Sequence, residues 1–217
     1  MNDWEITPTI FKHPFTCMIA GPTQSGKTHF IYNILKNNQL IIEPIIHKIV
    51  YCYSVWQDFF NQFSNIYPKV EFHQGIIDLS EINPYQNNLI ILDDLMTEGQ
   101  SNISILNLFT IDSHHKNTSV VFISQNLFSQ GKYSRSISLN SHYLIIFNNP
   151  RDKSQISVLG RQLFPNQSAF FLEAYEDCVE KRPFGYMFID LKQATEKRSR
   201  VQTGIIPGEQ RIIYTSK

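Results

Sequence analysis

Short, uninterrupted runs of apolar residues recur along the chain. Such runs predict strands that are covered on both faces, as in a parallel sheet. Between several of them, apolar residues recur at helical spacing, and strands that alternate with helices predict a doubly wound α/β sheet. The predicted strands are 15–20, 48–53, 70–73, 88–92, 119–124, 142–147 and 186–190, and the predicted helices are 28–37, 103–114, 153–163 and 168–180.

The C-terminal stretch is predicted to form a loop or a hairpin. Gly204, Pro207 and Gly208 are turn residues, and a short apolar segment at 211–214 follows them. The chain shows no internal repeat, and 217 residues suit one α/β domain with a sizeable core better than two. We therefore expect a single domain over 1–217.

A glycine-containing loop, called the glycine loop below, separates the first predicted strand from the first predicted helix. It matches the pattern G-x-x-x-x-G-K-[ST], in which backbone N–H groups turn inward around phosphate oxygens and the following helix adds its N-terminal partial positive charge. Lys27 is expected to neutralise the β- and γ-phosphates, and the Thr28 hydroxyl to ligate Mg²⁺. The pattern therefore predicts binding of ATP with magnesium. The loop consists of Gly21, Pro22, Thr23, Gln24, Ser25, Gly26, Lys27 and Thr28.

Polar residues follow two of the later predicted strands. Asp93 and Asp94 come directly after the apolar run 89–92, and Gln125 follows the run 119–124. Open α/β sheets bind ligands at the carboxyl ends of their strands, so these side chains are expected beside the glycine loop. We predict that Asp93 holds Mg²⁺ through water, that Asp94 orients or deprotonates the attacking water, and that Gln125 senses hydrolysis. The alternative is that the aspartates only cap the next segment and that Gln125 is an ordinary loop residue.

The charge balance is neutral overall but uneven along the chain. There are 19 basic and 19 acidic residues, so the whole molecule is not a polycation suited to nucleic acid. From about residue 181 onward, however, eight basic and three acidic residues give a net charge of +5, which leaves −5 for the remainder. Any DNA contact is therefore expected to involve this basic C-terminal extension, unless it is only a solvated tail.

Cysteine usage and hydropathy indicate an intracellular, soluble protein. Cys17, Cys52 and Cys178 are odd in number and far apart, which favours buried thiols over disulfides or a zinc site. The N-terminus lacks the basic and apolar segments of a signal peptide, and no apolar run is long enough to span a membrane.

The order of these motifs resembles the FtsK/HerA branch of P-loop ATPases, with a RecA/ASCE-like core. Within that branch the chain is similar to the poxvirus-type DNA-packaging ATPases of large and mid-sized DNA viruses and related virus-like transposons. The resemblance is carried by 21–28, 89–96 and 119–128, and more loosely by 139–152, so it spans roughly 15–163.

This resemblance implies a ring-forming motor that moves double-stranded DNA into a preformed capsid. It implies a capsid or portal-vertex partner, and a location in the virion or at the virus-assembly site of an infected cell. Lys27, Asp93 and Gln125 take the roles of P-loop lysine, magnesium carboxylate and sensor glutamine. The branch usually has Asp-Glu after the strand, whereas this chain has Asp94 in the glutamate position, with Glu98 as a weaker substitute base.

Three other functions are compatible with parts of the pattern. A GTPase is suggested by Asn149-Pro150-Arg151-Asp152, but Pro150 replaces the expected lysine and Met96 stands where a switch glycine belongs. A small-molecule kinase would need an arginine-rich lid, whereas the arginines are dispersed. A nucleotide-gated scaffold would bind ATP and assemble with little turnover.

The motifs contain no arginine to stabilise charge on the departing phosphate. Because an arginine supplied by a neighbouring subunit serves this purpose in comparable enzymes, we expect a ring with shared sites. Arg135, in a Gly- and Ser-containing loop, is the favoured candidate; Arg151 is expected to pair with Asp152, and Lys116 is a weaker candidate. The alternative is that Arg135 contacts solvent or DNA. His114 and His115 are expected to be solvated at a helix end.

Overall fold

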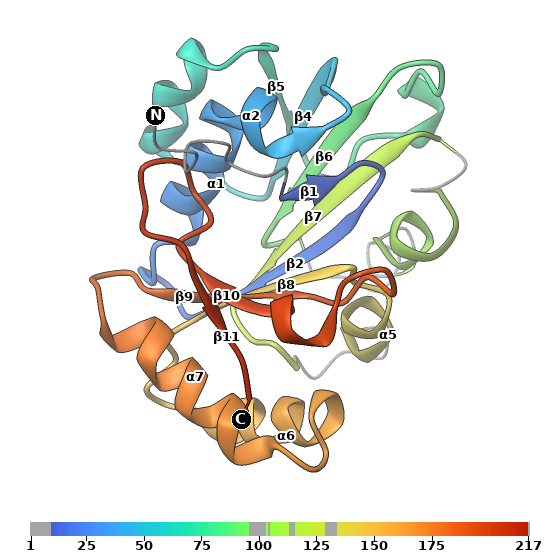
Figure 1. Ribbon diagram of the computed structural model, residues 1–217. Coiled ribbons are helices and arrows are strands. Elements are labelled where there is room, and N and C mark those ends of the chain that lie inside the picture. The colour runs from blue at the N-terminus through green and yellow to red at the C-terminus, as the bar shows by residue number, and fades with distance from the viewer. Residues whose placement is uncertain (1–9, 96–102, 104, 113–115, 129–133, 217) are drawn as a thin grey trace, which may run out of the picture.

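A mixed α/β fold with a large, mostly parallel central sheet organises the chain (Figure 1). The computed structural model describes residues 10–95, 103, 105–112, 116–128 and 134–216. Its main sheet has nine strands in the order β11-β10-β9-β8-β2-β7-β6-β4-β5, in which β8 to β5 are parallel to one another. This architecture is compatible with the expected doubly wound fold.

The parallel strands coincide with the apolar runs of the sequence. They are β2 (Thr16–Ala20), β4 (Lys48–Tyr53), β5 (Val70–Gln74), β6 (Asn88–Asp93), β7 (Thr118–Ser124) and β8 (Tyr143–Phe147). Successive side chains of a strand point to opposite faces, and both faces of this sheet are covered. In β6, Leu89 and Ile91 join one hydrophobic cluster, whereas Ile90 and Leu92 join the other. A run without alternation therefore fits a strand buried on both sides.

Helices cover the two faces of the sheet. The first face is covered by α1 (Lys27–Lys36), α2 (Asn38–Ile41) and the 3₁₀ segment η1 (Asp58–Asn65). The second is covered by α5 (Ser134–Leu139), α6 (Ser154–Leu163) and α7 (Ser168–Glu180). The expected helix at 103–114 is found where the chain is described: Ile103 and 105–107 are helical, and Leu108–Asp112 form a π-helical turn.

The C-terminal part extends the sheet with three antiparallel strands. They are β9 (Tyr186–Asp190), β10 (Val201–Thr203) and β11 (Ile212–Tyr214), and β10 with β11 forms the expected hairpin. A short 3₁₀ turn, η4 (Lys197–Ser199), precedes β10. Val201 and Ile189 are buried in the core, so the basic segment beyond residue 181 contributes apolar residues to the fold as well as charge.

Several short elements were not expected from the sequence. The two-residue strands β1 (Phe11–Lys12) and β3 (Ile42–Glu43) pair as a small parallel sheet, and η2 (Leu79–Glu81) is a single turn. Cys17, Cys52 and Cys178 are free and buried, as predicted. Among the described residues, no helix has the length and apolar character needed to cross a membrane.

Candidate functional site

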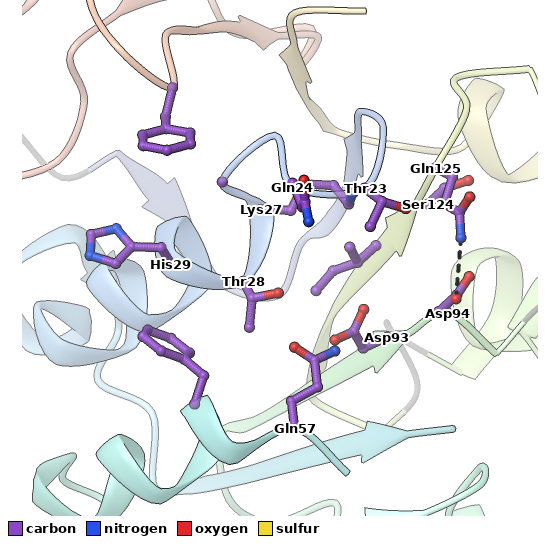
Figure 2. A pocket seen from close by; sticks show the side chains of 14 residues that line it. Thr23, Gln24, Lys27, Thr28, His29, Gln57, Asp93, Asp94, Ser124 and Gln125 are labelled. Carbon is purple, nitrogen blue, oxygen red and sulfur yellow. Dashed lines mark hydrogen bonds between the residues drawn. The ribbon is translucent and has the colours of Figure 1, made fainter. Parts of the chain in front are cut away.

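The glycine loop connects β2 to α1 at the carboxyl edge of the parallel strands (Figure 2). Two of its residues have positive φ, Gln24 at 65° and Gly26 at 100°. Only glycine adopts such a conformation without strain, so Gly26 suits the tight turn into α1. A side chain at Gly21 would overlap Phe147, with its Cβ 2.7 Å from that of the phenylalanine. Gly26 is therefore required by its backbone conformation and Gly21 by the local packing.

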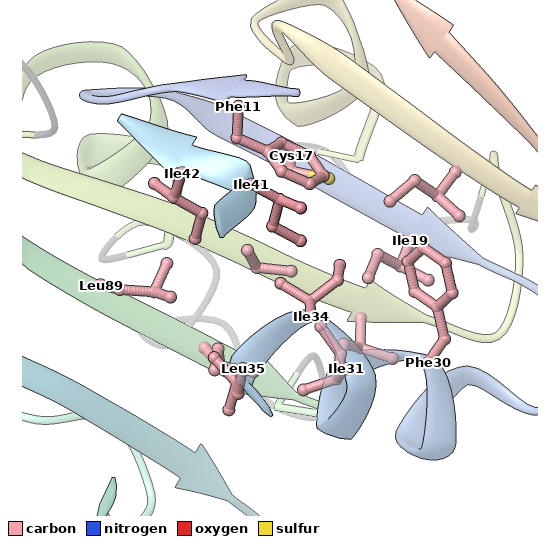
Figure 3. Packing of buried hydrophobic residues seen from close by; sticks show 14 of the residues in the cluster. Phe11, Cys17, Ile19, Phe30, Ile31, Ile34, Leu35, Ile41, Ile42 and Leu89 are labelled. Carbon is pink, nitrogen blue, oxygen red and sulfur yellow. The ribbon is translucent and has the colours of Figure 1, made fainter. Parts of the chain in front are cut away.

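Helix α1 is fixed against the sheet by its buried face. Phe30, Ile31, Ile34 and Leu35 recur at helical spacing and pack on residues of β2 and β6 such as Ile19 and Leu89 (Figure 3). Ile31 and Leu35 are fully buried. Because the apolar face is held this firmly, the start of α1, with Lys27 and Thr28, has a defined position relative to the strand ends.

The Lys27 ammonium group lies inside the glycine loop. Its Nζ donates hydrogen bonds to the carbonyl oxygens of Gly21 at 2.6 Å and Pro22 at 2.8 Å. Burial lowers the pKa of Lys27, while the nearby carboxylates of Asp93 and Asp94 act in the opposite direction. The loop thus positions a cation close to two carboxylates.

Asp93 is the buried carboxylate of the site. It is the last residue of β6, is 8% exposed, and accepts a hydrogen bond from the Tyr51 hydroxyl at 2.7 Å. Burial raises the pKa of Asp93, as does Asp94, while the Tyr51 hydrogen bond and Lys27 oppose the rise. Burial and the neighbouring carboxylate also raise the pKa of Tyr51. The Tyr51 hydroxyl therefore stays neutral and donates a hydrogen bond that fixes the position of one Asp93 oxygen.

Asp94 and Gln125 form the exposed part of the same cluster. Gln125 Nε2 donates to Asp94 Oδ2 at 3.4 Å, a long contact between two exposed side chains. Asp94 has φ 54°, a left-handed conformation that is uncommon for residues other than glycine and that concentrates at functional sites. Ser124 instead stabilises the loop, because its carbonyl accepts the Gly21 N–H at 3.2 Å.

These groups face one pocket of about 600 Å³, a volume within the range of small-molecule sites. Figure 2 shows Thr28, Gln57 and Asp93 directed into it from three separate segments of the chain. Sequence reasoning did not identify Gln57, His29, Phe59 or Phe184, which also line it. The predicted residues among its walls are Thr23, Gln24, Gly26, Lys27, Thr28, Asp93, Asp94 and Gln125.

The donor set at the pocket fits a magnesium ion that is bound together with phosphates. Within the described part of the chain, no cluster of three or more His, Cys, Asp or Glu side chains forms a self-sufficient metal cage. Mg²⁺ is usually bound through one or two protein oxygens plus phosphates and water. The Thr28 hydroxyl and the Asp93 carboxylate, both lining the pocket, are suited to that role.

Several other expectations have different outcomes. Arg135 lies in α5 and not in a loop, because Ile137 is buried and anchors a helix there; its side chain is outside the described residues. The expected ion pair between Arg151 and Asp152 is wrong: Asp152 accepts hydrogen bonds from Ser154 and Gln155. Lys116 is half-buried in the turn before β7. Met96, Glu98, His114 and His115 lie outside the described residues.

The start of α6 explains why Asp152 is not available to read a base. Its carboxylate accepts the Ser154 N–H at 3.1 Å and the Gln155 Nε2 at 2.6 Å. Gln155 in turn accepts the Phe128 N–H at 3.1 Å. Asp152 therefore hydrogen bonds to the first two residues of α6, and through Gln155 it is connected to the segment after β7. Neither Asn149 nor Asp152 lines the 600 Å³ pocket.

The chain was also compared with known proteins. No model of a known protein family matches it, and no protein of curated function has significant sequence similarity to it.

Proposed function

We propose that this protein is a magnesium-dependent P-loop ATPase. The observation that carries the proposal is the convergence of Lys27, Thr28, Asp93, Asp94 and Gln125 on one pocket at the carboxyl ends of β2, β6 and β7. These residues come from three separate segments of the chain. Parallel α/β sheets bind ligands at this edge, and the residue types supply a phosphate cation, metal ligands and groups that orient water.

Each side chain has a distinct part in the proposed reaction. Backbone N–H groups of the glycine loop and Lys27 bind the phosphates and compensate charge that develops on them. Thr28 and Asp93 hold Mg²⁺, which when bound shields the phosphate oxygens. Asp94 and Gln125 orient the attacking water, and the carboxylate of Asp94 is available to accept its proton.

The strand order supports the same proposal. Between β8 and β4 the order is β8-β2-β7-β6-β4, so β7 lies between the strand that precedes the glycine loop and the strand that ends at Asp93. We take this order as support for the RecA/ASCE-like core that the resemblance implies. Together with the resemblance of 21–28, 89–96 and 119–128 to the FtsK/HerA branch, it favours a motor that translocates double-stranded DNA, with packaging of a viral genome as its task.

Turnover measurements test the ATPase proposal. We expect ATP hydrolysis that requires Mg²⁺ and is stimulated by double-stranded DNA, with less turnover of GTP. Lys27→Ala should lower kcat by at least about 10²–10³-fold, because the transition-state charge loses its compensation. Lys48→Ala is the matched control. Lys48 is the first residue of β4, at the end of the strand away from the pocket, and pairs with Glu71 at 3.0 Å.

Different results would separate the competing functions. ATP binding without turnover would favour the nucleotide-gated scaffold, and a strong preference for GTP would favour the GTPase. Phosphate transfer to a small acceptor with no effect of DNA would favour the kinase. Equal turnover of wild type and Lys27→Ala would remove the glycine loop from the mechanism.

The DNA-binding part of the proposal concerns the basic C-terminal segment. Arg198 and Lys197 lie in η4 at the surface, the Arg198 side chain being 75% exposed. Deletion of this segment would remove the buried strands β9 and β10, so charge substitution is the suitable test. A plot of log affinity for DNA against log salt concentration has a negative slope, and the double variant Lys197→Gln/Arg198→Gln should make this slope less steep by about 2.

A surface control belongs with this experiment. Lys36→Gln/Lys69→Gln removes two exposed lysines, one at the end of α1 and one beside β5, at the other edge of the sheet from β11. Its salt slope should equal that of the wild type. If both double variants keep the wild-type slope, the DNA contacts lie elsewhere.

The ring part of the proposal is that one subunit completes the site of the next. Mixing Arg135→Ala subunits with Lys27→Ala subunits should restore some turnover, because a mixed junction can pair an intact glycine loop with an intact arginine. A lack of recovery at every mixing ratio, or full activity of Arg135→Ala alone, would exclude Arg135. Full activity of a monomer would exclude the ring.

A further inference from the structure

The pocket has an aromatic end, which the phosphate chemistry does not use. His29, Phe59 and Phe184 line it, and they are called the aromatic rim here. The ring centroids of His29 and Phe59 are 6.0 Å apart. In Figure 2 His29 lies on the far side of Thr28 from Asp93 and Asp94. The pocket therefore has a carboxylate end and an aromatic end, with the glycine loop and the start of α1 between them.

Phe184 combines surface exposure with an uncommon backbone conformation. It is 67% exposed, although it is large and apolar, and it adopts a left-handed backbone conformation with φ 58°. Non-glycine residues with such backbone angles are costly and persist where the surroundings enforce them. Apolar side chains that gather beside a cavity, as Phe184 and Phe59 do here, are typical of ligand-binding grooves.

The backbone around Phe184 fixes its position over the glycine loop. A side chain at Gly185 would clash with the backbone of Cys178 and Val179 in α7, so the turn after α7 packs closely. On the other side, a Cβ added to Gly26 would lie 3.0 Å from both Cβ and Cδ1 of Phe184. Phe184 thus contacts the loop directly, at the residue that precedes Lys27.

Phe59 is held equally firmly from the other side. Its ring packs on Tyr32 and Phe63, with centroid distances of 5.7 and 5.9 Å, and Phe63 is buried. Phe59 itself is only half-buried, so part of its ring remains exposed beside His29. The rim therefore consists of aromatic rings on rigid supports, with partly exposed surfaces.

We propose that the aromatic rim is the subsite for the base of the nucleotide, with the base stacked on Phe184 beside His29 and Phe59. The inference rests on the proposed binding of ATP, because it assigns the part of that ligand which the glycine loop does not hold. A nucleobase is planar and heteroaromatic, and stacking on an aromatic side chain is worth a substantial part of its binding. The phosphates at Lys27 and Thr28 then point toward Asp93, and the base points away from it.

Binding of two ligands tests the subsite: Mg·ATP and Mg·tripolyphosphate, which has the phosphate chain without the base. Phe184→Ala should weaken ATP binding by about 10-fold or more, within the range expected for loss of one stacking partner. It should leave the affinity for tripolyphosphate unchanged. In turnover assays the same variant should raise KM for ATP and leave kcat near the wild-type value.

Conservative and remote variants complete the design. Phe184→Tyr should retain ATP affinity, whereas Phe184→Leu, which keeps an apolar side chain without a ring, should behave like Phe184→Ala. Tyr85→Ala removes another aromatic ring, which is 95% exposed and lies near the start of β6, at the opposite end of the strands from the pocket. This variant should bind both ligands normally. Because Phe184 is exposed, these variants are expected to fold.

Two failures are distinguishable. If Phe184→Ala and wild type bind ATP equally, the rim is not the base subsite, even though phosphate binding stands. If wild type binds neither ATP nor tripolyphosphate, the proposed nucleotide site itself is wrong. Equal losses of ATP and tripolyphosphate affinity in Phe184→Ala would mean that Phe184 supports the glycine loop instead of the base.

Discussion

The two ends of the central parallel strands carry polar clusters of opposite character. The side where these strands begin is called the amino edge here, and the side where they end is the carboxyl edge. At the amino edge, His13 hydrogen bonds to Ser119 Oγ at 2.6 Å and to Asn117 Oδ1 at 3.1 Å. Ser119 also accepts the Phe15 N–H, and Asn117 donates to Asn87 at 2.8 Å. At the carboxyl edge, within the described part of the chain, Lys27 donates hydrogen bonds only to carbonyls of its own loop. Gln125 donates to Asp94 at 3.4 Å beside the 600 Å³ pocket.

This difference separates polar groups that stabilise the fold from polar groups that are available for a ligand. In the amino-edge cluster, donors and acceptors satisfy one another, as buried polar groups must if they are not to destabilise the protein. In the carboxyl-edge cluster, charged groups face a cavity with few protein partners. Substitutions at the first edge should therefore lower stability, whereas those at the second should lower activity.

The largest expected effect concerns the paired aspartates. Asp94→Asn should lower kcat by about 10²–10⁴-fold, as loss of a general base does, while ATP binding persists. Asp93→Ala should instead weaken binding of Mg·ATP, because the ion loses its protein carboxylate. Titration of Mg²⁺ and nucleotide, together with turnover, measures both. Asp78→Asn, at an exposed turn, is the control, and equal binding losses from both site variants would contradict the division of roles.

A smaller effect is expected from Tyr51, which positions Asp93. Tyr51→Phe keeps the ring in the core and removes the 2.7 Å hydrogen bond. Partners that orient a metal ligand typically contribute 10–100-fold in metal affinity. We therefore expect the Mg²⁺ concentration needed for half-maximal turnover to rise by about 10-fold. Tyr143→Phe is the matched control, because the buried Tyr143 hydroxyl accepts the Lys12 N–H at the amino edge. A loss of magnesium affinity in both variants would contradict the assigned role.

The amino-edge cluster is tested by His13→Ala. The change removes the imidazole that hydrogen bonds to the Ser119 hydroxyl and to the Asn117 side-chain oxygen, so the free energy of unfolding should fall by about 1–3 kcal/mol. Turnover per folded molecule should stay at the wild-type value. Urea unfolding and ATPase assays on the same samples measure the two quantities, and His73→Ala, at a half-buried histidine in β5 outside this cluster, is the control. A loss of turnover with unchanged stability would contradict the view that the amino-edge cluster serves the fold and not the activity.

The smallest effect is a pH dependence from the same histidine. Burial lowers the pKa of His13 below its ordinary value of 6.5; His47 and Lys192 act in the same direction, and the hydrogen bonds to Asn117 oppose it. The unfolded chain therefore binds the proton more tightly, and stability should fall as pH decreases from about 6.5 toward the lower folded-state pKa. Unfolding at pH 7.5 and 5.5 should show a larger loss for wild type than for His13→Gln. Equal losses would exclude His13 as the source.

Long apolar runs made most of the sheet predictable. The run 88–92 became β6, one residue longer, because a strand covered on both faces needs no polar alternation. The short elements β1, β3 and α2 contain too few residues for any periodicity to appear. The segment η1 buries Phe60 and Phe63, but three aromatic residues in eight did not indicate a 3₁₀ segment.

The candidate site was predictable in part for a similar reason. Parallel strands end at one edge of the sheet, so residues that follow β2, β6 and β7 converge there without any knowledge of tertiary contacts. Tyr51 was missed because its partnership with Asp93 depends on the register of β4 against β6, in which Tyr53 is opposite Asp93. Phe184 was missed because it reaches the pocket from a turn after α7, and no local pattern indicates that contact.

The reversed direction of β9 also determines when the pocket can form during protein synthesis. Since β9 is antiparallel to β8, with Tyr186 opposite Phe147, its first residues lie at the edge where the parallel strands end. Phe184 therefore joins a pocket whose first wall, the glycine loop, was made far earlier. At typical rates of translation the delay is roughly 8–30 s. On the proposed nucleotide site, a nascent chain would present the glycine loop first, and the proposed base subsite would form only after β9 has left the ribosome.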